Sequence, residues 1–255
     1  MKDTILNSLK NSKGKVGFYY KNLVTNEEIC FNENETFLAA SVIKLPILAE
    51  ILKQASLGNA DMSEIITVRN HDKMPICGAL CLFTNEPSVD IRTLCNLMIS
   101  LSDNTATNVL IKHFGIDKLN SGFRNMGLEK TKVTRLLFDQ ESQKLGNENL
   151  FAPKEIGSLL EQIYHKTFVS EKVSTEIEEI LLLQQINHKI PGKLPTDISV
   201  AHKTGENDCT THDVGIVYSK EPFVIVFASN DTDVPEFEEL IREISYQCLN
   251  NTMVN

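Results

Sequence analysis

Two kinds of hydrophobic spacing occupy different parts of the chain. Alternating or continuous apolar runs, rich in β-branched and aromatic residues, predict strands at 15–22 and 27–33 near the N-terminus. The same pattern predicts three strands near the C-terminus, at 198–205, 212–220 and 222–230. The strands therefore fall at the two ends of the chain.

Apolar residues three and four positions apart predict helices elsewhere. A short helix is expected at 3–12 and a closing helix at 236–250. Ser41 is expected to begin a helix over 41–56, because serine is favoured at helix starts. From about 57 to 195 the pattern is mainly helical. Its clearest helical runs are 89–102, 104–115, 152–166 and 173–185.

Strands at both ends with helices between them predict an α+β fold rather than a βαβ repeat. We expect one five-stranded antiparallel sheet, flanked by the N- and C-terminal helices, with the helical middle as an inserted all-helical lobe. The sheet lobe would comprise 1–56 and 196–255, and the helical lobe 57–195. The chain would then be one catalytic unit with its site between the lobes.

Composition narrows the class of protein. The chain has 255 residues, of which 42% are hydrophobic and 23% charged, so it can bury a sizeable core. The 25 Lys and Arg against 34 Asp and Glu give a net charge of −9, which argues against nucleic acid as a partner. No apolar run has the roughly 18 residues that a membrane span needs. The expected partner is a small molecule.

The termini and the cysteines exclude further possibilities. Polar residues, among them Asn7 and Lys10, interrupt any secretory signal, so a cytoplasmic protein is expected unless a leader has been removed. Six cysteines without CxxC pairs predict neither a disulfide framework nor a metal site. No metal and no cofactor is expected.

Three short motifs carry candidate chemistry. Ser41 and Lys44 lie one helical turn apart, where a neutral lysine amine can act as base for the serine hydroxyl. Ser102-Asp103-Asn104 offers a second hydroxyl and an amide, although these residues also suit a helix N-cap. Lys203-Thr204-Gly205 falls on a strand that can bind a carboxylate and an extended substrate, or be an ordinary solvated strand end.

Together, and in this order, the three motifs resemble the class A β-lactamases among the penicillin-recognising serine enzymes. The segments IRTLCNLMISLSDNTATNVLI and MGLEKTKVTRL are also similar to that family, and the likeness covers nearly the whole chain. The resemblance implies the β-lactamase/transpeptidase-like fold. It also implies that Ser41 is the acylated nucleophile.

The resemblance gives the other residues their roles. Lys44 would be the base or part of a proton relay, and Ser102 would pass a proton to the leaving nitrogen. Asn104 would hold Lys44 and the substrate amide, while Lys203 and Thr204 would bind the substrate carboxylate. Gly205 would let the backbone come close to the substrate. The backbone N–H groups of Ser41 and Glu206 would form the oxyanion hole.

The sequence departs from the family in the loop that normally carries a glutamate for activating water. Aligned on VTRL, the position expected for that glutamate falls on Gln140, which has no carboxylate. Glu141 is the candidate replacement, with Asp139 as another neighbour and a solvated loop position for Glu141 as the equal alternative. Deacylation is therefore the doubtful step.

A second departure follows Lys203-Thr204-Gly205. Glu206 stands where a small or hydroxyl residue is usual, and it would repel an anionic substrate if its side chain faced the site. No arginine follows on the next strand to hold the carboxylate. His212 is an alternative for that duty, although a structural or surface role for it is the stronger expectation.

The leading hypothesis is a serine hydrolase that opens β-lactam amides through an acyl-enzyme on Ser41, with deacylation weakened. The second is a penicillin-binding D,D-peptidase-like enzyme or an esterase that acts on another small amide or ester. The third is a non-catalytic binding protein, against which the three intact motifs argue. A monomer is expected in each case.

Overall fold

The computed structural model describes residues 1–254 and contains the predicted five-stranded sheet. Its strand order is β2-β1-β9-β8-β7, and every neighbouring pair is antiparallel. The strands are β1 (Lys15–Asn22), β2 (Glu28–Phe31), β7 (Ser199–Asn207), β8 (Thr210–Tyr218) and β9 (Phe223–Asn230). The α+β prediction is confirmed, and β7 lies at an edge of the sheet.

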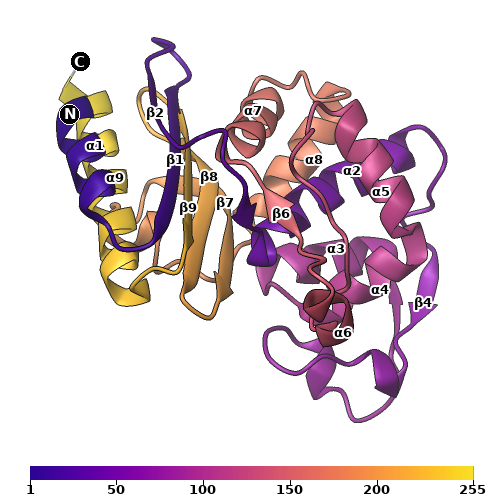
Figure 1. The fold of residues 1–255 in the computed structure, drawn as a ribbon. Helices are drawn as coiled ribbons and strands as arrows, with labels where there is room; N and C mark the ends of the chain where they lie inside the picture. Colours follow the sequence, from indigo (N-terminus) through magenta and orange to yellow (C-terminus); the bar gives the residue numbers. More distant parts are fainter. Residues whose placement is uncertain (255) are drawn as a thin grey trace.

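Two helices cover the outer face of the sheet, as predicted. They are α1 (Lys2–Asn11) and α9 (Val234–Val254), which lie side by side in Figure 1. Their apolar residues form one hydrophobic cluster with Phe18 and Tyr20 of β1, whereas Tyr19 belongs to the cluster on the opposite face. The period of two in a strand thus gives each face its own core.

The opposite face of the sheet packs against the helical part of the molecule (Figure 1). α7 contacts β1, β8 and β9, and it comes so close that a Cβ on Gly157 would lie 2.2 Å from the Tyr19 ring. The helices of this part are α2 (Lys44–Ser56), α3 (Ile91–Ser100), α4 (Asn104–Phe114), α5 (Ile116–Asn125), α6 (Gln140–Lys144), α7 (Pro153–Tyr164) and α8 (Glu171–Leu182).

Several short elements connect these helices. Two small sheets pair β3 (Phe37–Leu38) with β6 (Leu150–Phe151), and β4 (Ile65–Thr67) with β5 (Ser88–Asp90). The 3₁₀ turns are η1 (Ala40–Ile43), η2 (Asn70–Asp72), η3 (Leu80–Leu82) and η4 (Ile190–Lys193). No helix in residues 1–254 combines the length and apolarity of a membrane span.

α2 packs against α3, α4, α5 and α8 and therefore lies among the helices. The predicted sheet lobe, 1–56 and 196–255, includes these residues. The division into lobes at residues 57 and 195 stays a prediction.

Candidate active site

The turn that carries Ser41 differs from the predicted helix start. Ser41 lies in η1, and α2 begins three residues later, at Lys44. The Ser41 side chain makes no cap hydrogen bond, so the expectation that serine begins this helix as a cap is wrong. Ala40, just before it, has a φ of 42°, a left-handed conformation rare for alanine. The tight turn leaves Ser41 partly exposed while Lys44 is fully buried.

Lys44 is held by three oxygen atoms in the interior. Its Nζ donates to the backbone oxygen of Ser102 at 2.7 Å, to Ser102 Oγ at 3.0 Å and to Asn104 Oδ1 at 2.8 Å. Burial lowers the pKa of Lys44 well below its usual 10.5, and the Lys203 ammonium lowers it further. The structure therefore brings the first two motifs together around an amine that loses its proton readily.

The Ser102-Asp103-Asn104 segment combines a cap with the predicted site groups. Asp103 is the N-cap of α4 and accepts from the Ala106 N–H at 2.9 Å. Ser102, which precedes the cap, has a φ of 52°, in the left-handed region. Asn104 Oδ1 accepts from Lys44, while its Nδ2 donates to the Ile76 carbonyl at 2.9 Å. The cap interpretation and the functional one therefore both apply, to different residues of one tripeptide.

Ser102 Oγ also links the third motif to the first. The Nζ of Lys203 donates to it at 3.1 Å and to the Thr204 carbonyl at 2.8 Å. Lys203 is fully buried, and burial lowers its pKa to about 7. Two buried ammonium groups around one hydroxyl repel each other, so removing a proton from either one is favourable. Once Lys44 is neutral, the Ser102 O–H can donate to it and form a path for a proton.

β7 brings Lys203, Thr204 and Gly205 beside the Ser41 turn. β7 contacts both η1 and β8, and its other edge has no strand partner among the described residues. A Cβ on Gly205 would lie 3.1 Å from Val42 Cγ2 and 2.9 Å from the His212 ring. Glycine is therefore needed for this close approach, and the strand edge remains available for an extended substrate.

Glu206 has a partner that the sequence did not reveal. Its carboxylate lies 2.9 Å from the Nζ of Lys189, a fully buried residue that also donates to the Gly205 carbonyl at 3.3 Å. Burial alone would raise the pKa of Glu206, but the Lys189 ammonium holds it below 4.5. Glu206 thus stays ionised with its charge compensated, which weakens the expected repulsion of anionic substrates.

His212 is a structural residue. Its Nδ1 accepts from the Ser229 N–H at 3.1 Å, and its Nε2 donates to the Leu38 carbonyl at 2.8 Å. Burial lowers the pKa of His212 to about 3, so it is neutral near pH 7. Both ring nitrogens are occupied within the protein, and we assign it no carboxylate contact.

The structure does not bring Glu141 into the cluster. Glu141 lies in the short helix α6, its side chain is 91% exposed, and it pairs with Lys144 at 3.6 Å. Gln140, in the same helix, is also exposed. Instead Leu137 is fixed next to α4: Asn108 accepts from its N–H at 2.8 Å and donates to its carbonyl at 3.0 Å.

Asn108 lies one helical turn after Asn104, so both side chains are on the same side of α4. The loop residue that Asn108 binds there is Leu137. The carboxylate whose charge raises the pKa of Lys44 is that of Asp103, the cap of α4, and it does not come from the loop. The loop residue bound beside α4 is therefore Leu137, whereas the water-activating carboxylate was expected near Gln140 and Glu141.

Three features of the site were missed from the sequence. Lys189 gave no signal, because a lysine in a connecting segment is usually solvated. Residues 76–78 all have positive φ, and their chain is anchored where Asp103 Oδ2 accepts from the N–H groups of Ala79 and Leu80 at 2.7 and 2.9 Å. Asn108, whose side chain binds the Leu137 backbone, could have been found from the sequence. It comes four residues after Asn104 and therefore lies on the same face of the helix.

A partly exposed serine, a buried lysine of low pKa and a bridging second hydroxyl define a serine acyl-transfer enzyme. Comparison with known proteins agrees. The model of a family described as the β-lactamase enzyme family matches residues 1–252, so the chain belongs to this family. It is a serine hydrolase of the β-lactamase type.

Individual relatives are distant in sequence but similar over most of their length. β-Lactamase VEB-1 of Pseudomonas aeruginosa is 25% identical over 254 residues, which are 93% of this chain and 85% of VEB-1. The structure of PBP-A is 26% identical with a TM-score of 0.90, covering 100% of this chain and 96% of PBP-A. A β-lactamase from Sphaerobacter thermophilus is 25% identical with a TM-score of 0.89, covering 99% and 97%.

A second PBP-A structure, 25% identical with a TM-score of 0.90, covers 100% of this chain and 96% of PBP-A. It is of a leucine-to-glutamate variant as an acyl-enzyme complex with penicillin G.

Proposed function

We propose that the protein reacts with β-lactams to form an acyl-enzyme on Ser41 and releases the opened product slowly. The observation that carries the proposal is the position of Lys44. Its amine is buried one turn from Ser41 and is bound by both Ser102 and Asn104. Membership of the β-lactamase family supports the choice of β-lactams as substrates.

Each step of acylation has a group to perform it. Neutral Lys44 takes the Ser41 Oγ proton, and the oxygen attacks the lactam carbonyl carbon. The backbone N–H groups of Ser41 and Glu206 stabilise the oxyanion that forms. When the carbon–nitrogen bond breaks, Ser102 donates its proton to the leaving nitrogen and regains one from Lys44. Lys203 holds the substrate carboxylate through its ammonium charge.

The remaining residues of the motifs are assigned to binding the substrate. Thr204 and Gly205 lie on the free edge of β7, beside the Ser41 turn. We assign the Thr204 hydroxyl to the same carboxylate as Lys203, and the Gly205 backbone to close contact with the substrate. Asn104, which already binds Lys44, would receive the substrate side-chain amide.

Deacylation is the slow step, because it requires a base that takes a proton from water. Glu141 is 91% exposed and pairs with Lys144, and the loop residue clamped by Asn108 is Leu137. This arrangement also favours the second candidate function, a penicillin-binding D,D-peptidase-like enzyme whose acyl group passes to an acceptor other than water. The likeness to PBP-A supports that candidate.

The test is intact-mass spectrometry of the protein mixed with excess penicillin G, followed from seconds to hours. A mass gain of one penicillin that persists for many minutes is expected. Ser41→Ala removes the attacking oxygen and should abolish the gain. If Ser41→Ala is still labelled, Ser41 is not the nucleophile. If the wild-type protein is never labelled and never consumes penicillin, a non-catalytic binding protein becomes the better hypothesis.

The slow step has its own variant. Leu137→Glu places a carboxylate at the clamped loop position and is expected to shorten the acyl-enzyme lifetime by about 10-fold or more, within the range of a positioned base. Leu137→Gln is the matched control, with the same size and no basic oxygen. Equal lifetimes in both variants would show that water activation is not what limits release.

We also propose that the working unit is a monomer, because Ser41, Lys44, Ser102 and Lys203 all come from one chain. Size-exclusion chromatography with light scattering at activity-assay concentrations tests this. A stable dimer would contradict it.

A further inference from the structure

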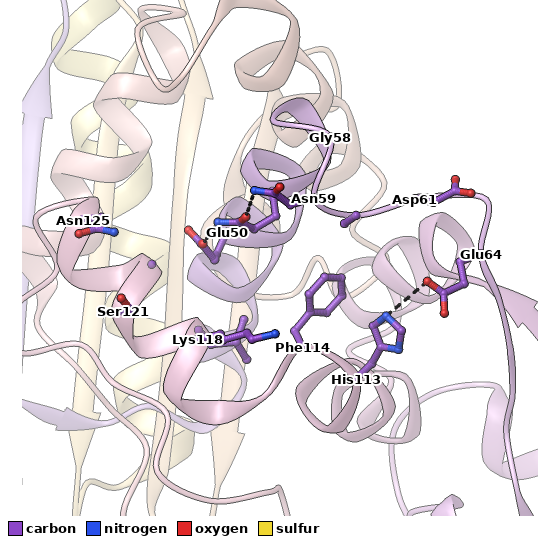
Figure 2. A pocket seen from close by; sticks show the side chains of 14 residues that line it. Glu50, Gly58, Asn59, Asp61, Glu64, His113, Phe114, Lys118, Ser121 and Asn125 are labelled. Carbon is purple, nitrogen blue, oxygen red and sulfur yellow. Dashed lines mark hydrogen bonds and ion pairs between the residues drawn. The ribbon is translucent and has the colours of Figure 1, made fainter.

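A cavity lies in the helical part of the molecule, away from the catalytic cluster. It has a volume of about 670 Å³, and it is bounded by the second half of α2, the segment that follows α2, the end of α4 and α5 (Figure 2). None of its lining residues belongs to the Ser41, Lys44, Ser102 and Lys203 cluster. Its volume is in the range of pockets that bind small molecules, about 300–1,000 Å³.

The charged side chains of the lining are mostly acidic. Three carboxylates line it, those of Glu50, Asp61 and Glu64, against the single ammonium of Lys118. His113 also lines the cavity, and its Nε2 lies 3.6 Å from Glu64. Even with Lys53 counted, whose ammonium pairs with Glu50 at 3.0 Å, the carboxylates at the cavity outnumber the ammonium groups. An anionic occupant is therefore disfavoured and a cationic one favoured.

Glu50 is the most unusual of these carboxylates, because the residue is only 4% exposed. It is pressed against α5, where a Cβ on Gly122 would come within 2.0 Å of its carboxyl carbon. Its two oxygens accept from Gln54 Nε2 at 2.6 Å and Lys53 Nζ at 3.0 Å. A carboxylate has about four acceptor positions, so Glu50 can accept further hydrogen bonds from a ligand in the cavity.

The cavity also has an aromatic wall. Phe114 lies between Glu50 and His113 in Figure 2, and the Phe114 and His113 rings pack edge-to-face with their centroids 4.9 Å apart. Leu119 adds an apolar side chain to the lining. A cavity that contains both an aromatic ring and carboxylates can bind organic cations, through cation–π attraction and charged hydrogen bonds.

From this geometry we propose that the cavity is a second binding site, for a small organic cation. The ligand class is a primary amine or guanidinium with a short apolar or aromatic stem. Its cationic head donates to Glu50 and its stem packs on Phe114 and Leu119, while Glu64, beyond Phe114 in Figure 2, attracts the cation at longer range. The site is separate from the β-lactam chemistry and does not depend on it.

The probe is benzylamine, and benzyl alcohol is its uncharged counterpart of nearly equal size. Backbone amide signals of ¹⁵N-labelled full-length protein would be followed by NMR during titration with each compound. Benzylamine is expected to shift the signals of residues around Glu50, Phe114 and Lys118, with benzyl alcohol binding at least about tenfold more weakly. Equal binding of the two compounds, or shifts centred on Ser41 and Lys203, would overturn the proposal.

Variants locate the interactions. Glu50→Gln and Phe114→Leu are each expected to weaken benzylamine binding about tenfold, while Glu179→Gln, which removes an exposed charge on α8, leaves it unchanged. Because Glu50→Gln disturbs bonds within α2, the exposed Glu64→Gln provides a second test, with a loss of about two- to threefold. Unchanged binding in both Phe114→Leu and Glu64→Gln would refute the site even if Glu50→Gln fails to fold.

Discussion

Raising the pH above 7 is expected to weaken acylation by anionic β-lactams, because Lys203 loses its charge. Burial of Lys203 lowers its pKa from 10.5 to about 7. At 1.36 kcal/mol per pKa unit, this is a destabilisation of the ammonium form by about 5 kcal/mol. The protonated fraction is then about one half at pH 7, about 10% at pH 8 and about 1% at pH 9.

Only protonated Lys203 attracts the substrate carboxylate, so kcat/KM for acylation should fall about tenfold per pH unit above 7. Lys44 has the opposite requirement, because it acts as base in its neutral form. Activity should therefore rise with pH on the acid side, as Lys44 loses its proton, and fall on the basic side as Lys203 does. The two lysines share Ser102, so the limbs report the pair rather than independent residues.

The assay is kcat/KM for a chromogenic cephalosporin between pH 6 and 9, since kcat/KM reports ionisations of the free enzyme. An uncharged p-nitrophenyl ester is the control, because it has no carboxylate for Lys203 to bind and should not show the basic limb. Lys203→Arg keeps its charge at pH 9 and should remove the basic limb for the cephalosporin. The reasoning is refuted if both substrates fall equally above pH 7, or if Lys203→Arg retains the fall.

Three further changes test separate parts of the structure. Gly205→Ala introduces a methyl group 3.1 Å from Val42 and 2.9 Å from His212. Because β7 must move to make room for it, acylation should slow about 10–100-fold, with the melting temperature much less affected. An unchanged acylation rate would contradict the close approach. Asp103→Ala removes the cap of α4 and two hydrogen bonds to loop N–H groups, and should cost about 2–4 kcal/mol in urea unfolding, with Asp103→Asn losing less. Glu141→Gln should leave the acyl-enzyme lifetime within about twofold of wild type, and a tenfold change would identify Glu141 as the water base after all.

The sheet and most helices could be predicted from the sequence because their spacing reflects burial directly. Strands β8 and β9 are buried at nearly every position, and β9 and the second half of β8, from Val214, are almost continuously apolar. α5 was not recognised, because its sequence contains Asn, Ser and Gly and has few buried residues, among them Leu119 and Phe123. Its position depends on packing against α2 and α4, which no local pattern encodes.

The candidate site was predictable where residues act through a fixed spacing. Ser41 and Lys44 are three residues apart, and Ser102 and Asn104 flank the cap residue Asp103. This spacing alone predicts that the members of each pair lie close together. The setting of Glu206 was not predictable, because its partner Lys189 comes from a connecting segment and is buried only by the folded sheet. The direction of Glu141 likewise depends on how the loop lies, which the sequence left open.

The sheet order has a consequence for how the chain reaches this fold. β1 pairs with β9 along its whole length, and each residue of β1 is more than 200 positions from its partner. The N-terminal hairpin of β1 and β2 therefore keeps one edge unpaired until nearly the whole chain has been synthesised. Such distant pairing slows folding, and an open apolar strand edge can associate with other chains. Synthesis that pauses before β9 should accordingly yield aggregated protein rather than a smaller folded fragment.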